Sequence, residues 1–320
     1  MNATIALSDL NHVCPLDCIS SIENPSFVSP DESSAHTTER VIGISVNGEA
    51  RAYPLSEFRE VVNDTIAGMP VLVTWCPLCG TPIAFERRVD GEEVEFGVSG
   101  KLHHNDLVLY DRESFTLWQQ ITGKAIVGPG VPGQLRMISA SLVSLGDWVE
   151  RHPETGVLAG GTVTRSSGRM LPYEEELQRE AAGDRDQETY SNARPDTRLD
   201  GYQVVHGVEV DGDAKAYPVE SVRGVGTMQD TVAGRSILIV APDGTNFVHA
   251  FRSPSSSESW STNISVTSGE ITDSTGRRWA LDGAALSTET QDLQELPVIR
   301  SYWFAWSAFH PNSELYHDGT

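Results

Sequence analysis

The sequence lacks the features that would assign it at once to several familiar classes. No stretch approaches 18 consecutive apolar residues, so we expect no membrane-spanning helix. The opening MNATIALSDLNHVCPLDC has no basic start followed by an apolar run, so we expect no secretory signal peptide. There is also no Gly-rich phosphate loop, no GxSxG, no HExxH and no basic aromatic patch. These absences argue against a nucleotidyl, hydrolase or nucleic-acid function.

Cysteine and lysine are both scarce. Four cysteines in 320 residues are too few for a secreted fold held together by disulfides, so we expect a cytoplasmic protein with mostly reduced thiols. Of the 23 basic residues only Lys101, Lys124 and Lys215 are lysine.

Acidic residues, by contrast, are abundant. There are 45 of them, and the net charge is −22. They are scattered along the chain, which is typical of a surface adapted to a salty cytoplasm, where salt screens the self-repulsion. Such a surface repels nucleic acid and anionic lipid. We therefore expect a halophilic protein with neither nucleic acid nor a membrane among its partners.

The sequence contains an internal repeat. GISVNGEARAYPLSEF (43–58) returns as GVEVDGDAKAYPVESV (207–222), and NDTIAGMPVLVTW (63–75) returns as QDTVAGRSILIVA (229–241). Further matches pair Trp118 with Trp279, and the Trp148/His152 ending with Trp306/His310. Because these matches occur in the same order, the repeat predicts one fold duplicated.

Most local signals within the repeat are for strands. Asn47-Gly48, Asp211-Gly212 and Asp90-Gly91 are dipeptides of type I′ hairpin turns. We expect few helices, around 55–62, 142–151, 173–182 and 303–309. The predicted fold class is α+β, β-dominated, with two tandem modules. The expected divisions are an extension (1–39), a first module (40–158), a polar connector (159–203) and a second module (204–320).

Two of the four cysteines form a CxxC motif in VTWCPLCGTPIAFE (73–86), directly after a run that is typical of a buried strand. In the second copy, Pro242 and Thr245 occupy the positions of Cys76 and Cys79. The turn therefore does not need sulfur to form, which makes these cysteines candidates for chemistry. The alternative is that they are reduced core residues.

Four longer motifs resemble the DUF3179 family, whose activity is not established: AYPLSEF…VNDTIAGMPVLVTWCPLCGT, FGVSGKLHHNDLVLYDR, LWQQITGKAIVG and YWFAWSAFHP. The resemblance runs from about Ile22 to Tyr316. It implies redox chemistry, since selenocysteine replaces a cysteine of this motif in some relatives. This chain has Arg59-Glu60 where relatives often have His-Glu, and Leu109 where many have Met. If the site of the family were a soft-metal site that uses that His and Met, this chain would lack both ligands, which argues against a copper-type site here.

Three interpretations of Cys76 and Cys79 remain open, and thiol-based oxidoreduction ranks first. Its substrate would be an unknown small molecule or protein thiol, no cofactor would be required, and the first cysteine would be the nucleophile. In the second interpretation the pair binds one zinc, iron or copper ion together with His103, His104, Cys14 or Cys18. In the third the pair is structural.

The redox interpretation makes a geometric prediction. Cys76 should be partly exposed at the end of its strand, with Cys79 close enough to bridge it. An activating group, His103, His104 or Arg112, should lie within a few ångströms of the thiols.

Several other residues have weaker signals. On a strand, adjacent His103 and His104 would point to opposite faces. Arg112 and Gln120 have no counterpart in the second copy and stay candidate site residues. The remaining expectations are structural: an Asp–Arg pair and a packed Trp in the hairpin of Asp111 and Trp118, a helical core stripe of Trp303, Trp306 and Phe309, and helix ends at His152 and His310.

Overall fold

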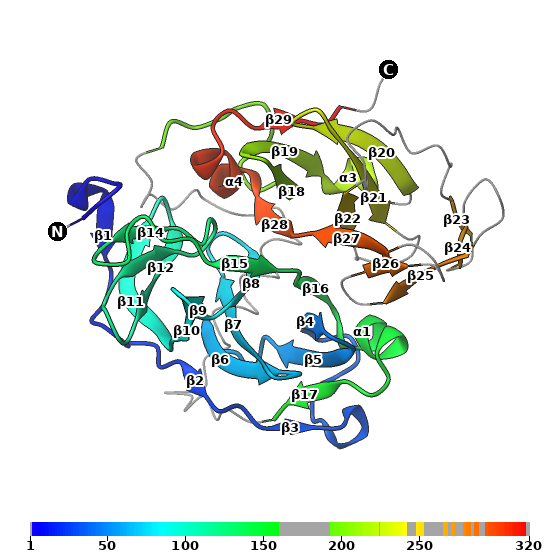
Figure 1. Cartoon of the computed structure of the whole chain (residues 1–320), viewed down its shortest axis with the longest axis horizontal. Coiled ribbons are helices and arrows are strands. Elements are labelled where there is room, and N and C mark those ends of the chain that lie inside the picture. Colours follow the sequence, from blue (N-terminus) through cyan, green and yellow to red (C-terminus); the bar gives the residue numbers. More distant parts are fainter. Residues whose placement is uncertain are drawn as a thin grey trace.

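The protein is β-dominated with a few short helices, as the sequence predicted. A computed structural model describes residues 2–159, 193–223, 225–241, 248–252, 265–267, 270–272, 278–282, 285–287 and 292–317. Within this part of the chain, five larger sheets have a propeller-like arrangement (Figure 1). The predicted helix 173–182, most of the connector, and Pro242 and Thr245 lie outside the described residues.

Three of these sheets belong to the first half of the chain. In each, hairpins form the centre and short strands from other segments complete the edges. The β4 sheet has the order β16 (Ser141–Ser144), β4 (Arg40–Val46), β5 (Glu49–Pro54), β17 (Gly156–Leu158) and β3 (Phe27–Val28). The β7 sheet has the order β15 (Arg136–Ile138), β8 (Thr81–Glu86), β7 (Met69–Cys76), β6 (Val61–Ile66) and β2 (Ile22–Glu23). The β12 sheet has the order β1 (Leu10–His12), β11 (Phe96–His103), β12 (Asp106–Asp111), β13 (Leu117–Gln119) and β14 (Ala125–Val127).

The second half of the chain forms the other two larger sheets. The β18 sheet has the order β28 (Val298–Tyr302), β18 (Val204–Val210), β19 (Asp213–Pro218) and β29 (Glu314–Leu315). The β21 sheet has the order β20 (Gly226–Val232), β21 (Arg235–Ala241), β22 (His249–Arg252), β27 (Asp292–Leu296), β26 (Ala285–Ser287), β25 (Arg278–Asp282), β24 (Glu270–Thr272) and β23 (Ser265–Thr267). A small two-stranded sheet, β9 (Arg88–Val89) with β10 (Glu92–Glu93), flanks the first half.

The hairpin turns follow the predicted dipeptides. Asn47-Gly48, Asp90-Gly91 and Asp211-Gly212 all have positive φ at both residues, as a type I′ turn requires. They join β4 to β5, β9 to β10 and β18 to β19.

The helical predictions were right at two places and wrong at one. Helix α4 (Trp303–Phe309) coincides with its prediction, and α1 (Leu145–Arg151) occupies the second part of 142–151. Residues 55–60 form a turn and irregular backbone, and β6 begins at Val61. A helix does not form because this short connection between β5 and β6 buries Leu55 and Phe58 in the core. The other helical segments are short: α3 (Val219–Val222), η1 (Leu7–Asp9) and η2 (Pro30–Glu32).

One hydrophobic core crosses between the two halves of the chain. It joins the end of β7 and the strands of the β12 sheet to Val205, Ile299 and the α4 residues Trp303 and Trp306. Both tryptophans are fully buried, so most of the predicted helical stripe is core. The thiol turn after β7 therefore lies inside the molecule, against the second half.

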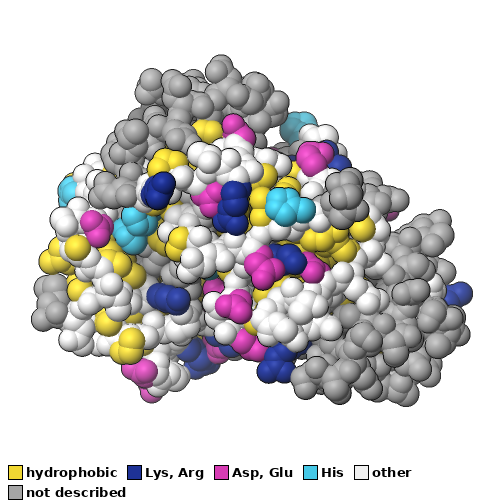
Figure 2. Space-filling view, turned by 90° about the horizontal axis from the view of Figure 1, so that it is seen from above, with side chains coloured by type: hydrophobic (Ala, Val, Ile, Leu, Met, Phe, Trp, Pro, Cys, Tyr) yellow, Lys and Arg dark blue, Asp and Glu magenta, His cyan; other side chains and the backbone are white. Residues whose placement is uncertain are grey.

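Charged side chains of both signs lie at the surface. On the face shown in Figure 2, Lys and Arg side chains are interspersed with Asp and Glu side chains. Among the described residues, no helix is both long and apolar enough to cross a bilayer.

Candidate functional site

The CxxC motif occupies the hairpin connection between β7 and β8. Strand β7 ends at Cys76, which pairs with Thr81 at the start of β8. Gly80 has a φ of +64°, a conformation that favours glycine. As the sequence predicted, the motif follows a buried strand and leads into another strand rather than a long helix.

Both thiols of the motif are free and buried. The exposed fraction is 1% for Cys76 and 0% for Cys79. The prediction that Cys76 is partly exposed is wrong, because β28 and α4 cover the turn. The Tyr302 N–H donates to the Cys79 carbonyl at 2.9 Å.

A third group, the carboxyl of Asp106, lies close to the two thiols. One ligand atom from each of Cys76, Cys79 and Asp106 lies within 4.8 Å of the others. Asp106 lies close to the thiols because a tight hairpin joins β11 to β12. In this hairpin His104 and Asn105 have φ of 52° and 69°. This turn also directs the Asn105 carbonyl to accept from the Cys76 thiol at 3.7 Å.

The two oxygens of Asp106 have different surroundings. Oδ2 accepts from the Gln119 side-chain amide at 2.5 Å and from the Ile121 N–H at 2.9 Å. Oδ1 is buried without a hydrogen bond of normal geometry among the described residues, although the Cys79 thiol is close enough to influence the carboxyl. Burial raises the pKa of Asp106 to about 7. Burial, followed by the neighbouring Cys76 and Asp106, raises the pKa of Cys79.

The adjacent histidines lie at the edge of this cluster. His103 Nδ1 is 2.7 Å from Gln119 Oε1, so Gln119 connects His103 to Asp106. The expectation that the two rings point to opposite faces is wrong. His104 begins the turn instead of continuing the strand, so the ring centroids lie 4.1 Å apart and both rings contact Phe309. Burial, followed by His103, lowers the pKa of His104.

Arg112 and Gln120 have other partners. The Arg112 guanidinium pairs with Asp17 at 2.9 Å and with Glu23 at 3.5 Å, and none of its described bonds involves the thiols. Gln120 is fully buried and bonds Thr74 of β7 and Thr81 of β8. It therefore supports the hairpin that carries the cysteines without joining the cluster.

The hairpin of Asp111 and Trp118 is partly as predicted. The Trp118 Nε1–H donates to Asp111 Oδ2 at 2.9 Å, and both side chains are buried. The expected Asp–Arg pair is replaced by the Arg112–Asp17 pair. At the other end of each half, His152 and His310 cap α1 and α4 as predicted.

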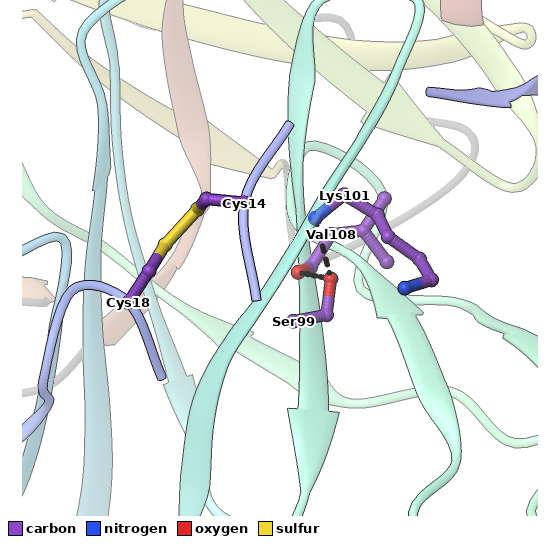
Figure 3. Close-up of a disulfide and its surroundings, with 5 residues drawn as sticks. All are labelled: Cys14, Cys18, Ser99, Lys101 and Val108. Carbon is purple, nitrogen blue, oxygen red and sulfur yellow. Dashed lines mark hydrogen bonds between the residues drawn. A yellow bond between two sulfur atoms is a disulfide. The ribbon is translucent and has the colours of Figure 1, made fainter. Parts of the chain in front are cut away.

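The other two cysteines form a disulfide, Cys14–Cys18, whereas mostly reduced thiols were expected. Neither can act as a ligand beside the thiol turn while the disulfide is intact. Figure 3 shows the disulfide beside β11, near Ser99 and Lys101. At this place the register between β11 and β12 shifts, and Ser99 Oγ donates to the Val108 carbonyl at 2.5 Å. The Gly100 carbonyl accepts hydrogen bonds from the backbone N–H groups of Val13 and Cys14. The N-terminal segment is thus attached to the same sheet that supplies Asp106.

Two participants in the site, Asp106 and Gln119, were not predicted from the sequence. Asp106 stands in the motif HHND that drew attention to the histidines, and it is a carboxyl at the start of a strand whose next three residues are apolar. Gln119 is adjacent to Gln120, and only the fold shows which of the two faces Asp106.

Comparison with known proteins assigns the chain without adding a function. The family model for a protein of unknown function (DUF3179) matches residues 16–313. No curated protein matches the chain, and no solved structure matches it. Since the match covers nearly the whole chain, the protein belongs to the DUF3179 family of proteins of unknown function.

Proposed function

We propose that Cys76, Cys79 and Asp106 bind one divalent metal ion of the zinc class. The single observation that carries this proposal is the buried convergence of two free thiols and a carboxyl oxygen that lacks a normal hydrogen bond. Cysteine sulfur and carboxylate oxygen are both ordinary zinc ligands. A mixed sulfur and oxygen set favours zinc over magnesium or calcium, which take oxygen alone.

Electrostatics supports the same conclusion. A carboxylate in an apolar interior is costly unless a hydrogen-bonded or cationic partner offsets the loss of water. Among the described residues, no ion pair involves Asp106; Gln119 and Ile121 donate to Oδ2, and the Cys79 side chain and the Leu107 backbone also interact with the carboxyl. A cation at Oδ1 would supply the missing partner and would stabilise both thiolates.

The number of ligands bears on what such a centre could do. Three protein donors are one short of a closed tetrahedral zinc site, and the three-donor pattern is typical of catalytic zinc. A bound ion would supply Lewis acidity at the remaining position. Gln119 would hold Asp106 in place and link it to His103 at the edge of the site.

Metal analysis of the reduced protein tests this proposal. We expect about one zinc ion per chain, and a cobalt-substituted protein with a thiolate-to-cobalt absorption band. Cys76→Ser and Asp106→Asn should each weaken binding by about 10- to 100-fold or more. Asp111→Asn is the matched control, since Asp111 is a buried carboxyl at the far end of the same strand. A wild-type protein that binds none of zinc, iron or copper would refute the proposal.

The second candidate function is dithiol oxidoreduction, which the closeness of the two free thiols favours. Cys76 and Cys79 would lose two protons and two electrons to form a disulfide, while a small disulfide substrate is reduced to two thiols. Burial of both sulfurs favours a small molecule over a protein as the partner. Mass spectrometry after equilibration with oxidised glutathione should then show a Cys76–Cys79 linkage. A metal-free protein whose two thiols stay reduced would exclude this candidate.

We also infer that the two halves descend from one duplicated unit and that the protein works in a salty cytoplasm. The first inference is supported by the matched sequence order and by matching contacts in the β4 and β18 sheets. An experimental structure in which 40–158 and 204–316 fail to superpose would overturn it. The second is supported by the net charge of −22. It predicts a higher unfolding midpoint in molar potassium chloride than in dilute buffer, and an equal midpoint would count against it.

A further inference from the structure

The second half of the chain holds the thiol turn through two hydrogen bonds. The Tyr302 N–H donates to the Cys79 carbonyl, and Arg300 Nη1 donates to the Gly80 carbonyl at 2.7 Å. Both donors lie in β28, which follows the turn by more than 200 residues in the sequence. The carbonyls of two consecutive turn residues are therefore fixed by one distant strand.

Gly80 allows this close approach. A Cβ at this position would lie 2.8 Å from Arg300 Nη1 and 2.9 Å from the Tyr302 ring, so any other residue would displace one of them. Arg300 itself is only 9% exposed, and its guanidinium lies 5.6 Å from the centre of the Tyr302 ring. The cation is thus held in the interior, one residue away from Cys79.

The first half of the chain shows that the sheet does not need a charge at this position. In the β18 sheet Arg300 pairs with His206, next to the Gly207 that Trp306 covers. At the matching place in the β4 sheet, next to the Gly43 that Trp148 covers, the pair is Leu142 with Ile42.

The fold alone therefore does not explain why His206 and Arg300 are polar. Burial, followed by Arg300, lowers the pKa of His206 to about 3. At neutral pH this pair accordingly carries a single positive charge, on Arg300.

We propose that Arg300 is a positioning residue of the Cys76/Cys79/Asp106 site, so that the second half of the chain completes a site carried by the first. This inference rests on the proposed metal-binding function. Two thiolates and one carboxylate carry one more negative charge than a divalent ion neutralises. The Arg300 guanidinium offsets that excess, and its bond to Gly80 fixes the backbone beside Cys79.

Cobalt titration of reduced variants tests the role of Arg300. Arg300→Gln removes the charge and should weaken cobalt binding by about 10- to 100-fold, as loss of a group that supports metal ligands does. Arg300→Lys keeps the charge and should bind within a few-fold of wild type, with a shifted cobalt absorption spectrum. Gly80→Ala, which would displace Arg300 or the Tyr302 ring and would strain the turn at a φ of +64°, should also weaken cobalt binding.

Arg87→Gln is the matched control. Arg87 is also a buried arginine that donates to backbone carbonyls, those of Asp64 and Val94, and none of its described partners belongs to the thiol turn. Its loss should lower stability and leave cobalt affinity and spectrum unchanged. A purely structural role for Arg300 would instead make the two glutamine variants alike.

The possible outcomes distinguish the role of Arg300 from the metal-binding function on which that role depends. Wild-type protein that binds no cobalt would overturn both. The role of Arg300 alone would be overturned if wild type binds cobalt and Arg300→Gln binds it with the same affinity. The same conclusion would follow if Arg87→Gln loses as much cobalt affinity as Arg300→Gln. If Arg300→Gln does not fold, the cobalt absorption spectrum of Arg300→Lys tests the inference instead. A spectrum identical to that of wild type would overturn the inference.

Discussion

The β4 sheet and the β18 sheet are built in the same way from similar sequences. Each has a central type I′ hairpin, an antiparallel strand on one side and a short parallel strand on the other. Each is covered by a seven-residue helix, α1 or α4, whose tryptophan contacts a glycine of the central hairpin. The Trp148 Nε1–H donates to Thr155, and the Trp306 Nε1–H donates to Ser313.

The two sheets differ in the side chains around this shared frame. Ile42 and Leu142 in one become His206 and Arg300 in the other, where β28 reaches the thiol turn. At this pair of positions the first half is apolar, and the second half is polar where β28 contacts the thiol turn. A substitution that acts on the frame should have equal effects in both sheets, whereas one that acts on the site should not.

The largest effect should come from the glycine under each tryptophan. Gly43→Ala and Gly207→Ala would each place a Cβ inside the contact distance of the indole ring, of Trp148 or Trp306. We expect each to lower the free energy of unfolding by about 2–3 kcal/mol, since overpacking forces the ring or the strand to move. Denaturant unfolding would measure both. A large loss in one variant with none in the other would show that the two sheets are not packed alike.

The two sheets also differ in how a tyrosine–aspartate pair is supported. Tyr53 donates to Asp64 at 2.6 Å, and Tyr217 donates to Asp230 at 2.8 Å, but Asp230 also pairs with Lys215 at 2.7 Å. Tyr53→Phe should therefore cost about 2 kcal/mol, because the buried Asp64 loses its hydroxyl donor. Tyr217→Phe should cost about 1 kcal/mol, since Lys215 still satisfies Asp230. Equal losses in urea unfolding would show that Lys215 contributes nothing.

Glu60 gives the smallest expected effect, and it depends on pH. Glu60 has a φ of 47°, and the matching position in the second half is Gly226, with a φ of 71°. Burial raises the pKa of Glu60 from 4.5 to about 7. A carboxyl with a raised folded pKa binds its proton more tightly when folded, so stability falls as pH rises between these two values.

Replacing Glu60 should therefore stabilise the protein at higher pH. At pH 8 we expect Glu60→Gln to be more stable than wild type by about 1 kcal/mol. The gain should shrink toward zero below pH 4.5. Glu60→Gly, the residue of the second half, should add relief of the left-handed backbone conformation at all pH values. A gain from Glu60→Gln that is the same at pH 4 and pH 8 would contradict the assignment to this carboxyl.

Local sequence determined the turns, the strand-rich composition and family membership. Dipeptides such as Asn47-Gly48 predict a hairpin because their backbone conformation is set within two residues. The Cys76 turn was also predictable, since its signals lie within one strand and the next. The 55–62 helix was wrong because burial against other strands outweighed a weak local preference.

The surroundings of the thiols depend on contacts between segments that are far apart in the sequence. Asp106 joins Cys76 and Cys79 because two hairpins from different sheets meet, and Arg300 reaches Gly80 from more than 200 residues away. The exposure of Cys76 likewise depends on α4 and β28, which no pattern near residue 76 describes. Local spacing determines which face of a strand a side chain occupies, but the packing of sheets determines what that face meets.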